Sequence, residues 1–232
     1  FHKYSPTSAL FMAPFAYLPD IIGLSTWNVL NAMAVFFAIR ILPVNNRTKA
    51  LLLWFVLNEL LTTLSNAQSN GLMCGLIIAA FACMERGKTL WAALWLVLAT
   101  YIKVYGIIGC CLFLFYPGKL KFTAWMIFWT VVFALLPLLV TTPQLLAMQY
   151  HHWAALMAAD AAAATGLSVN GLLSAWFGID NAGRVVTITG LLLFVLPFLK
   201  FRLYANETYR LLVLAFLLIW VIIFNHKAES PT

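Results

Sequence analysis

The residues of this sequence with the clearest chemical potential lie inside or beside long apolar runs. Lys103 is the one charged residue of the apolar run 89–116, and a polar cluster, SNAQSNG at residues 65–71, follows another such run. An ammonium group at the centre of a bilayer costs several kcal/mol unless it finds a partner. Lys103 therefore indicates either a partnered charge in the middle of a crossing or a turn between two shorter helices.

The length of the run 89–116 favours the turn. As a single α-helix these residues would extend about 42 Å, which is too long for one ordinary bilayer crossing and short for two. We therefore predict two short helices that turn at Lys103 and Gly106, because glycine tolerates the conformations of a tight turn. This arrangement predicts a cavity that is sunk into the membrane and contains Lys103.

Other residues with chemically reactive side chains give less support to a functional site. Glu59 lies inside an apolar run, where an acid either lines a functional cavity or holds helices together, and both interpretations stay open. His151 and His152 are neighbours and point in different directions on a helix, so a shared metal site is not expected. The four cysteines lie in apolar runs without a CxxC spacing, which predicts neither a disulfide nor a metal site. No P-loop, GxGxxG or zinc motif occurs, and we expect no cofactor.

The composition is that of a polytopic membrane protein. Apolar residues make up 64% of the chain and charged residues 9%, and the mean hydropathy is +0.94. The formal net charge of +7 comes from basic residues in short loops between apolar runs. That pattern is typical of membrane orientation and does not indicate nucleic-acid binding, so the expected environment is a lipid bilayer.

The apolar runs predict an all-α transmembrane bundle that forms one domain over residues 1–232. About eight spans are expected, at residues 21–42, 50–65, 72–84, the two legs of 89–116, 122–140, 184–199 and 211–224. Residues 1–20 hold three prolines and are too short to cross, which predicts an interfacial or half-inserted helix. Residues 141–180 predict a long loop with two amphipathic helices, broken at Thr165 and Gly166.

Alternating these spans divides the basic residues unequally between two faces. One face receives ten of the fourteen lysines and arginines: Arg40, Arg47, Lys49, Arg86, Lys88, Lys119, Lys121, Lys200, Arg202 and Arg210. The positive-inside rule makes that face cytoplasmic. A single crossing at 89–116 would largely cancel the bias, which independently supports the turn. The other face collects residues 1–20, residues 65–71, Lys103 and the long loop, so function is expected on the periplasmic or extracellular side of the cell membrane.

Several motifs, in this order, resemble glycosyltransferase family 87, which has the GT-C fold. They are YSPTSALFMAPFAYLP at 4–19, Trp27 with Asn28, NAQSNG at 66–71, YIKVYG at 101–106 and ESPT at 229–232. The resemblance covers most of the chain. It implies an enzyme that takes a mannose-like sugar from a polyprenyl phospho-sugar donor and transfers it to a hydroxyl of a glycolipid or glycan acceptor on the outer face.

The resemblance also implies roles for particular residues. A departing lipid phosphate needs positive charge at a water-poor depth, which Lys103 would supply, and amides would hold sugar hydroxyls. The expected substrate-binding residues are Lys103, Gln68, Asn70, Tyr4, His226 and Glu229. The general base of the family is expected before Phe1. Asp20 follows Tyr4 instead of preceding it, so we do not take it as that base, and no metal is expected.

Two other classes of function stay open. A secondary transporter also places a lysine and polar residues in a cavity between broken helices, although the two halves of this chain show no corresponding interrupted segments. A non-catalytic membrane subunit of a polysaccharide assembly system is the other alternative. The alternative for Lys103 itself is an interfacial lysine whose ammonium reaches the headgroups.

Overall fold

The helices of the protein follow the apolar segments of its sequence. The computed structural model describes residues 4–162, 169–179 and 183–224, and this part of the chain is all-α and contains no strand. Its elements are α1 (Pro6–Ala16), α2 (Asp20–Ile41), α3 (Asn46–Ser65), α4 (Asn70–Glu85), α5 (Thr89–Ile102), η1 (Val104–Phe115), α6 (Lys119–Leu135), η2 (Leu136–Leu139), α7 (Pro143–Ala162), α8 (Val169–Phe177), α9 (Gly183–Val195), η3 (Leu196–Leu199), η4 (Phe201–Leu203) and α10 (Glu207–Phe224), where η marks a 3₁₀ helix.

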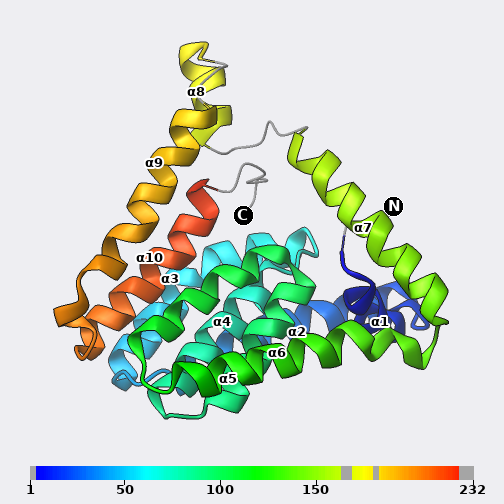
Figure 1. Ribbon diagram of the computed structural model, residues 1–232, viewed down its shortest axis with the longest axis horizontal. Helices are drawn as coiled ribbons and strands as arrows, with labels where there is room; N and C mark the ends of the chain where they lie inside the picture. Colours follow the sequence, from blue (N-terminus) through cyan, green and yellow to red (C-terminus); the bar gives the residue numbers. More distant parts are fainter. Residues whose placement is uncertain (1–3, 163–168, 180–182, 225–232) are drawn as a thin grey trace.

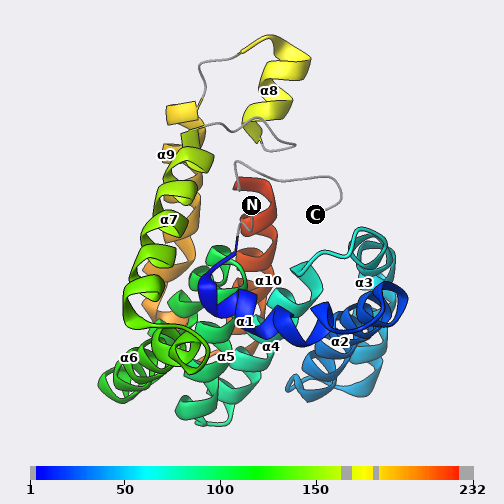
Figure 2. The same ribbon diagram turned by 90° about the vertical axis from the view of Figure 1, so that its right-hand side faces the viewer.

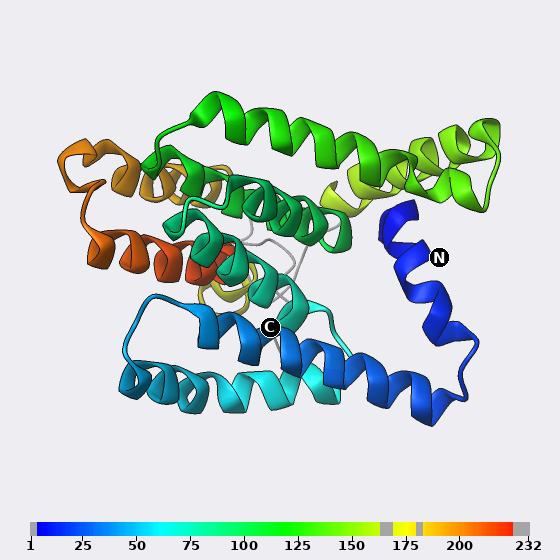
Figure 3. The ribbon, with the colours of Figure 1, turned by 90° about the horizontal axis from the view of Figure 1, so that it is seen from below.

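The helices form a row with two extensions. Helices α3, α2, α4, α5 and α6 lie side by side in that order (Figure 3). Helix α7 lies where the helices of the row have one of their ends, whereas α9 and α10 lean away from the opposite ends of these helices (Figure 1). Figure 2 shows the short helix α8 beyond the far end of α9, away from the row. Two helices, α7 and α8, do form in residues 141–180, and the predicted break between them lies outside the described residues. Their predicted amphipathic character and outer-face position stay predictions.

The predicted number of spans is only partly confirmed. Within the described ranges, three segments are long and apolar enough to cross a membrane: α2, α6 continued by η2, and α10. Helices α4, α5 and η1 and the segment α9–η3 are shorter apolar helices. At about 1.5 Å per residue, the 16 residues of α4 extend roughly 24 Å, less than the ~30 Å hydrocarbon core. Helix α3 also differs from a simple span because it carries Arg47, Lys49 and Glu59.

The predicted turn at Lys103 is confirmed. Helix α5 ends at Ile102, Lys103 has an extended backbone with φ −147° and ψ 121°, and η1 begins at Val104. The amide of Lys103 donates to the carbonyl of Ala99 over 2.8 Å, and the amide of Gly106 donates to the carbonyl of Lys103 over 2.8 Å. The two legs of the run 89–116 therefore form a helical hairpin with Lys103 at its tip.

The second leg of this hairpin is a 3₁₀ helix of 12 residues, and its glycines allow close packing. Residues three apart lie on one face of a 3₁₀ helix, and the buried residues of η1 are Gly106, Gly109, Leu112 and Phe115. A Cβ atom on Gly106 would lie 2.5 Å from the carbonyl carbon of Ala99. The backbones of η1 and α5 are therefore in direct contact at this glycine.

We expect Gly106→Ala to destabilise the protein by roughly 1–3 kcal/mol, because the new methyl group must push two backbones apart. Thermal unfolding of the purified protein in detergent measures this effect. Gly190→Ala is a matched control, since its new Cβ would meet the ring of Phe224 at 2.5 Å and a ring can move more easily than a backbone. Equal melting temperatures for the two variants would contradict the close backbone contact.

Helix α4 lies at the centre of the row and carries most of the core. Twelve of its 16 residues are buried, and Ala80, Phe81 and Ala82 are fully covered. A Cβ on Gly75 would lie 2.7 Å from the carbonyl carbon of Ala34, so α2 and α4 also touch through their backbones. A helix that is buried on nearly every side has apolar residues on all of its faces, which explains why residues 72–84 carry no polar stripe.

The connections between helices gather at two ends, as the alternation of spans predicts. At the end with the basic loops, Arg86 donates to the carbonyl of Ile41 over 2.6 Å. There Arg210 also makes a bidentate pair with Glu85, with Nε–Oε1 at 2.6 Å and Nη2–Oε2 at 2.7 Å. Tyr116 donates a hydrogen bond to the same carboxylate. Helices α4, η1 and α10 are thereby joined at this end.

Candidate functional site

The site lies at the opposite end, where buried hydroxyl groups anchor α1. Ser5 caps α1 by accepting from the amide of Ser8 over 3.1 Å, and its hydroxyl donates to the carbonyl of Tyr101 over 2.7 Å. Thr7 donates to the carbonyl of Phe133 over 2.7 Å. Ser5 and Thr7 are 1% and 0% exposed. These bonds fix the segment that begins with Tyr4 against α5 and α6.

Helix α7 joins the same anchor through Tyr150. Its phenolic oxygen lies 3.0 Å from the Thr7 hydroxyl and donates to the carbonyl of Ala134 over 3.1 Å. Burial raises the pKa of the Tyr150 phenol, so this group keeps its proton at neutral pH. The polar residues of the Tyr4 segment thus have a structural role, which is to hold α1 between α5, α6 and α7.

Three of the predicted site residues form one hydrogen-bonded chain. The ammonium of Lys103 donates to Oδ1 of Asn70 over 2.6 Å, across 33 residues of sequence. Nδ2 of Asn70 in turn donates to Oε1 of Gln68 over 2.5 Å. All three residues are half-buried. The hairpin tip and the polar cluster 65–71 therefore meet, and they present an ammonium group and two amides at one place.

Helix α2 holds the turn that carries Gln68 and Asn70. Asn31 is fully buried, donates to the carbonyl of Trp27 over 3.0 Å, and accepts from the amide of Leu72 over 2.9 Å. The indole of Trp27 donates to the carbonyl of Ala67 over 3.0 Å. Ala67 has a positive φ of 50°, which few residues other than glycine adopt. Sequence reasoning missed Asn31, although an amide inside an apolar span was a visible signal.

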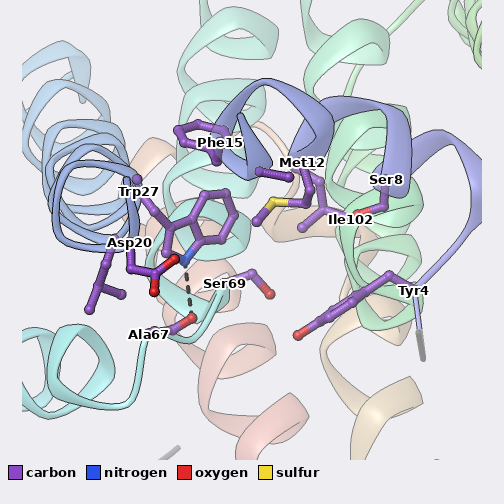
Figure 4. Close-up of a pocket in the computed structure, with 12 residues that line it drawn as sticks. Tyr4, Ser8, Met12, Phe15, Asp20, Trp27, Ala67, Ser69 and Ile102 are labelled. Carbon is purple, nitrogen blue, oxygen red and sulfur yellow. Dashed lines mark hydrogen bonds between the residues drawn. The ribbon is translucent and has the colours of Figure 1, made fainter. Parts of the chain in front are cut away.

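A cavity of about 510 Å³ lies at the same end of the helices (Figure 4), and Lys103, Asn70 and Gln68 are not among the residues that line it. Its walls come from α1, the start of α2, the turn 67–69 and the end of α5, and they include Tyr4, Asp20, Trp27, Ser69 and Ile102. Ser69 directly precedes Asn70 and Ile102 directly precedes Lys103. In two separate segments of the chain, therefore, a residue that lines the cavity is followed directly by a residue of the Lys103–Asn70–Gln68 chain.

One wall residue of this cavity has an unsatisfied hydroxyl group. Ser69 is only 3% exposed, and among the described residues its Oγ has no hydrogen-bond partner. It stands just before α4 and makes no side-chain capping bond to that helix. Leaving a buried hydroxyl unpaired costs about 1–3 kcal/mol, so Ser69 is suited to a polar ligand.

A second cavity of about 890 Å³ lies on the other side of α1, between α1, η2 and α7. Its lining combines apolar residues such as Leu10 and Leu156 with His152 and Trp153. Tyr4 borders both cavities, so the residue that opens the predicted Tyr4 segment stands between two spaces. Within the ranges that the structure describes, no group of three or more side chains is arranged to hold a metal ion.

The remaining predicted site residues, His226 and Glu229, lie outside the described residues. Asp20 is the residue whose position sequence reasoning missed. It follows Tyr4 in the chain, yet the bend between α1 and α2 returns it to the cavity that Tyr4 borders.

The fold and the site define a class: an all-α membrane protein with a lysine and amide chain beside a cavity at one end of its helices. More specifically, the chain belongs to glycosyltransferase family 87, whose family model matches residues 1–224. Membership in this family implies a transferase that uses a sugar donor and an acceptor. No curated protein and no solved structure matches the chain.

Proposed function

We propose that the protein transfers a mannose-like sugar from a polyprenyl phospho-sugar to a hydroxyl of a glycolipid or glycan on the outer face of the cell membrane. The observation that carries the proposal is the ammonium of Lys103, held at 2.6 Å by Asn70 beside a cavity. This group lies at the end of the bundle opposite the basic loops. The positive-inside rule makes that end periplasmic or extracellular.

Lys103 is suited to bind the phosphate of the donor. When the sugar leaves, negative charge grows on the lipid phosphate, and a fixed cation in a water-poor site stabilises that charge. Asn70 orients the ammonium through a neutral amide oxygen, which leaves the positive charge of the lysine intact. Gln68 continues the chain and fixes the amide of Asn70.

The proposed reaction is a single displacement at the anomeric carbon. A bond forms from the acceptor oxygen to that carbon while the bond from the carbon to the phosphate oxygen breaks. The electron pair of the broken bond stays on the lipid phosphate, and the proton of the acceptor hydroxyl passes to a base. We assign that base to no residue of this chain, and a direct displacement inverts the anomeric configuration.

The surroundings of Lys103 suit a lipid-linked donor. Helix α1 is an 11-residue helix that contains Pro14, and the second cavity is lined by both α1 and α7, which meet at Thr7 and Tyr150. We place the helices α1, α7 and α8 at the outer membrane surface. Tyr4 then lies between the two cavities, both of which it borders. His226 and Glu229, which lie outside the described residues, are also proposed to bind substrate.

Transfer of radiolabelled mannose tests the proposal. The complete protein, reconstituted in vesicles, is expected to move label from polyprenyl phospho-mannose to a glycolipid or glycan fraction. Vesicles without the protein control for spontaneous transfer. Solute flux without transfer would contradict the proposal and favour a transporter, whereas absence of both activities with several donor sugars would favour a non-catalytic subunit.

A further inference from the structure

We propose that the cavity beside Lys103 binds the sugar ring of the donor through Trp27, Asp20 and Ser69. This inference rests on the proposed function, because it assigns one part of the same substrate to one part of the site. None of these three residues belongs to the lysine and amide chain. The cavity's volume of about 510 Å³ falls within the usual range for small-molecule sites, about 300–1,000 Å³.

The indole of Trp27 offers a fixed aromatic surface. Its Nε1 donates to the carbonyl of Ala67 over 3.0 Å, and the ring of Phe15 meets it edge-on with centroids 5.7 Å apart. Two contacts therefore set the plane of the indole before any ligand arrives. A sugar ring has one face of C–H groups, and such an apolar face packs well on a rigid aromatic ring.

Asp20 and Ser69 supply polar groups of complementary kinds. Asp20 is exposed at the first residue of α2, and its carboxylate only accepts hydrogen bonds, which suits neighbouring sugar hydroxyls as donors. Ser69 both donates and accepts, and its buried Oγ has no partner among the described residues. Figure 4 shows Asp20, Trp27 and Ser69 around the same space, with the Ser69 hydroxyl directed into it.

The backbone connects the cavity to the proposed phosphate site at two points. Ser69 and Ile102 line the cavity, and the next residue in each segment, Asn70 or Lys103, belongs to the proposed phosphate site. In a phospho-sugar the phosphate is bonded directly to the anomeric carbon. A phosphate at Lys103 therefore places the sugar ring within reach of the cavity. An isoprenoid chain in the same cavity would leave Asp20 and Ser69 without partners.

Two soluble fragments of the donor test this assignment separately. The complete protein in nanodiscs is titrated by calorimetry with a short alkyl mannoside and with an alkyl phosphate of the same chain length. We expect Asp20→Asn to weaken mannoside binding about tenfold or more, because the sugar hydroxyls lose a charged acceptor. We expect a similar loss in Trp27→Phe, because the smaller ring lacks the bond to Ala67 that fixes the indole. In Asp20→Asn, alkyl phosphate binding should change less than about twofold, because Lys103 and the turn that carries Asn70 are both intact.

Glu59→Gln is the matched control, since Glu59 is an exposed acid on α3 and does not line the cavity. Unchanged mannoside binding in both Asp20→Asn and Trp27→Phe would overturn the inference. An equal loss of mannoside and phosphate binding in Asp20→Asn would also overturn it, because the cavity would then not be specific to the sugar. If the complete protein transfers no sugar but Asp20→Asn still loses mannoside binding, the transferase proposal fails and the sugar cavity stands.

Discussion

Replacing Lys103 by methionine is expected to lower kcat/KM for the polyprenyl phospho-sugar by about 10- to 100-fold while the protein still folds. A hydrogen bond to a charged group contributes roughly 1.5–3 kcal/mol, and the developing charge on the phosphate uses this contribution in the transition state. Methionine keeps the length of the side chain and its apolar stem. Because Lys103 is half-buried at the tip of a hairpin, its replacement leaves the helical core unchanged.

Steady-state transfer kinetics on the complete protein measure this loss. Lys103→Arg should retain part of the activity. Arginine keeps the positive charge, but its planar guanidinium cannot take the position of the compact lysine ammonium. Lys88→Met removes an exposed lysine from the opposite end and should leave kcat/KM unchanged. If Lys103→Met transfers sugar as well as the wild type, the proposal that Lys103 binds the donor phosphate is wrong. Lys103 is then an interfacial lysine whose ammonium reaches the lipid headgroups.

Replacing Arg210 by methionine is expected to lower the free energy of unfolding by about 3–5 kcal/mol, the usual cost of breaking a buried ion pair from one side. Glu85 and Arg210 are 9% and 14% exposed, and the arginine also donates to the carbonyl of Tyr204 over 2.8 Å. Without Arg210 the carboxylate of Glu85 keeps only the hydrogen bond from Tyr116 among the contacts described above. An uncompensated charge would then remain between α4, η1 and α10.

Thermal unfolding in detergent, read as a shift in Tm, measures this cost. Arg202→Met is the control, because Arg202 is an exposed arginine in the connection that leads into α10. The double variant Glu85→Met with Arg210→Met should recover much of the stability, since it removes both charges together. A single variant as stable as the control would show that the pair contributes nothing to the attachment of α10.

Much of the helical layout was predictable because the membrane restricts the choices. The length of residues 89–116 and the cost of a central charge were sufficient to predict the hairpin at Lys103. The 3₁₀ form of η1 was not predicted, because α and 3₁₀ helices have similar composition and differ through close packing. The spacing of Gly106, Gly109 and Leu112 was a visible sign of a three-residue repeat.

The site was predictable only where chain order and membrane side were sufficient. The alternation of spans correctly brought Lys103 and residues 65–71 to one end, but it did not indicate which amide contacts the lysine. Asp20 was missed because its place depends on the angle between α1 and α2, and chain order does not report such angles. The pairing of Glu85 with Arg210 spans 125 residues, which no local pattern reveals.

The 3₁₀ geometry of η1 has a consequence for the length of the molecule. Twelve residues at about 2.0 Å each extend roughly 24 Å, whereas the same residues as an α-helix would extend only about 18 Å. Helix α4 also extends about 24 Å, with Asn70 at one end and Glu85 at the other. Lys103 bonds to the first of these residues and Tyr116 to the second. Both bonds can form together because η1 and α4 have equal lengths. Winding η1 into an α-helix would shorten it by about 6 Å, so that Lys103 and Tyr116 could no longer reach Asn70 and Glu85 at the same time.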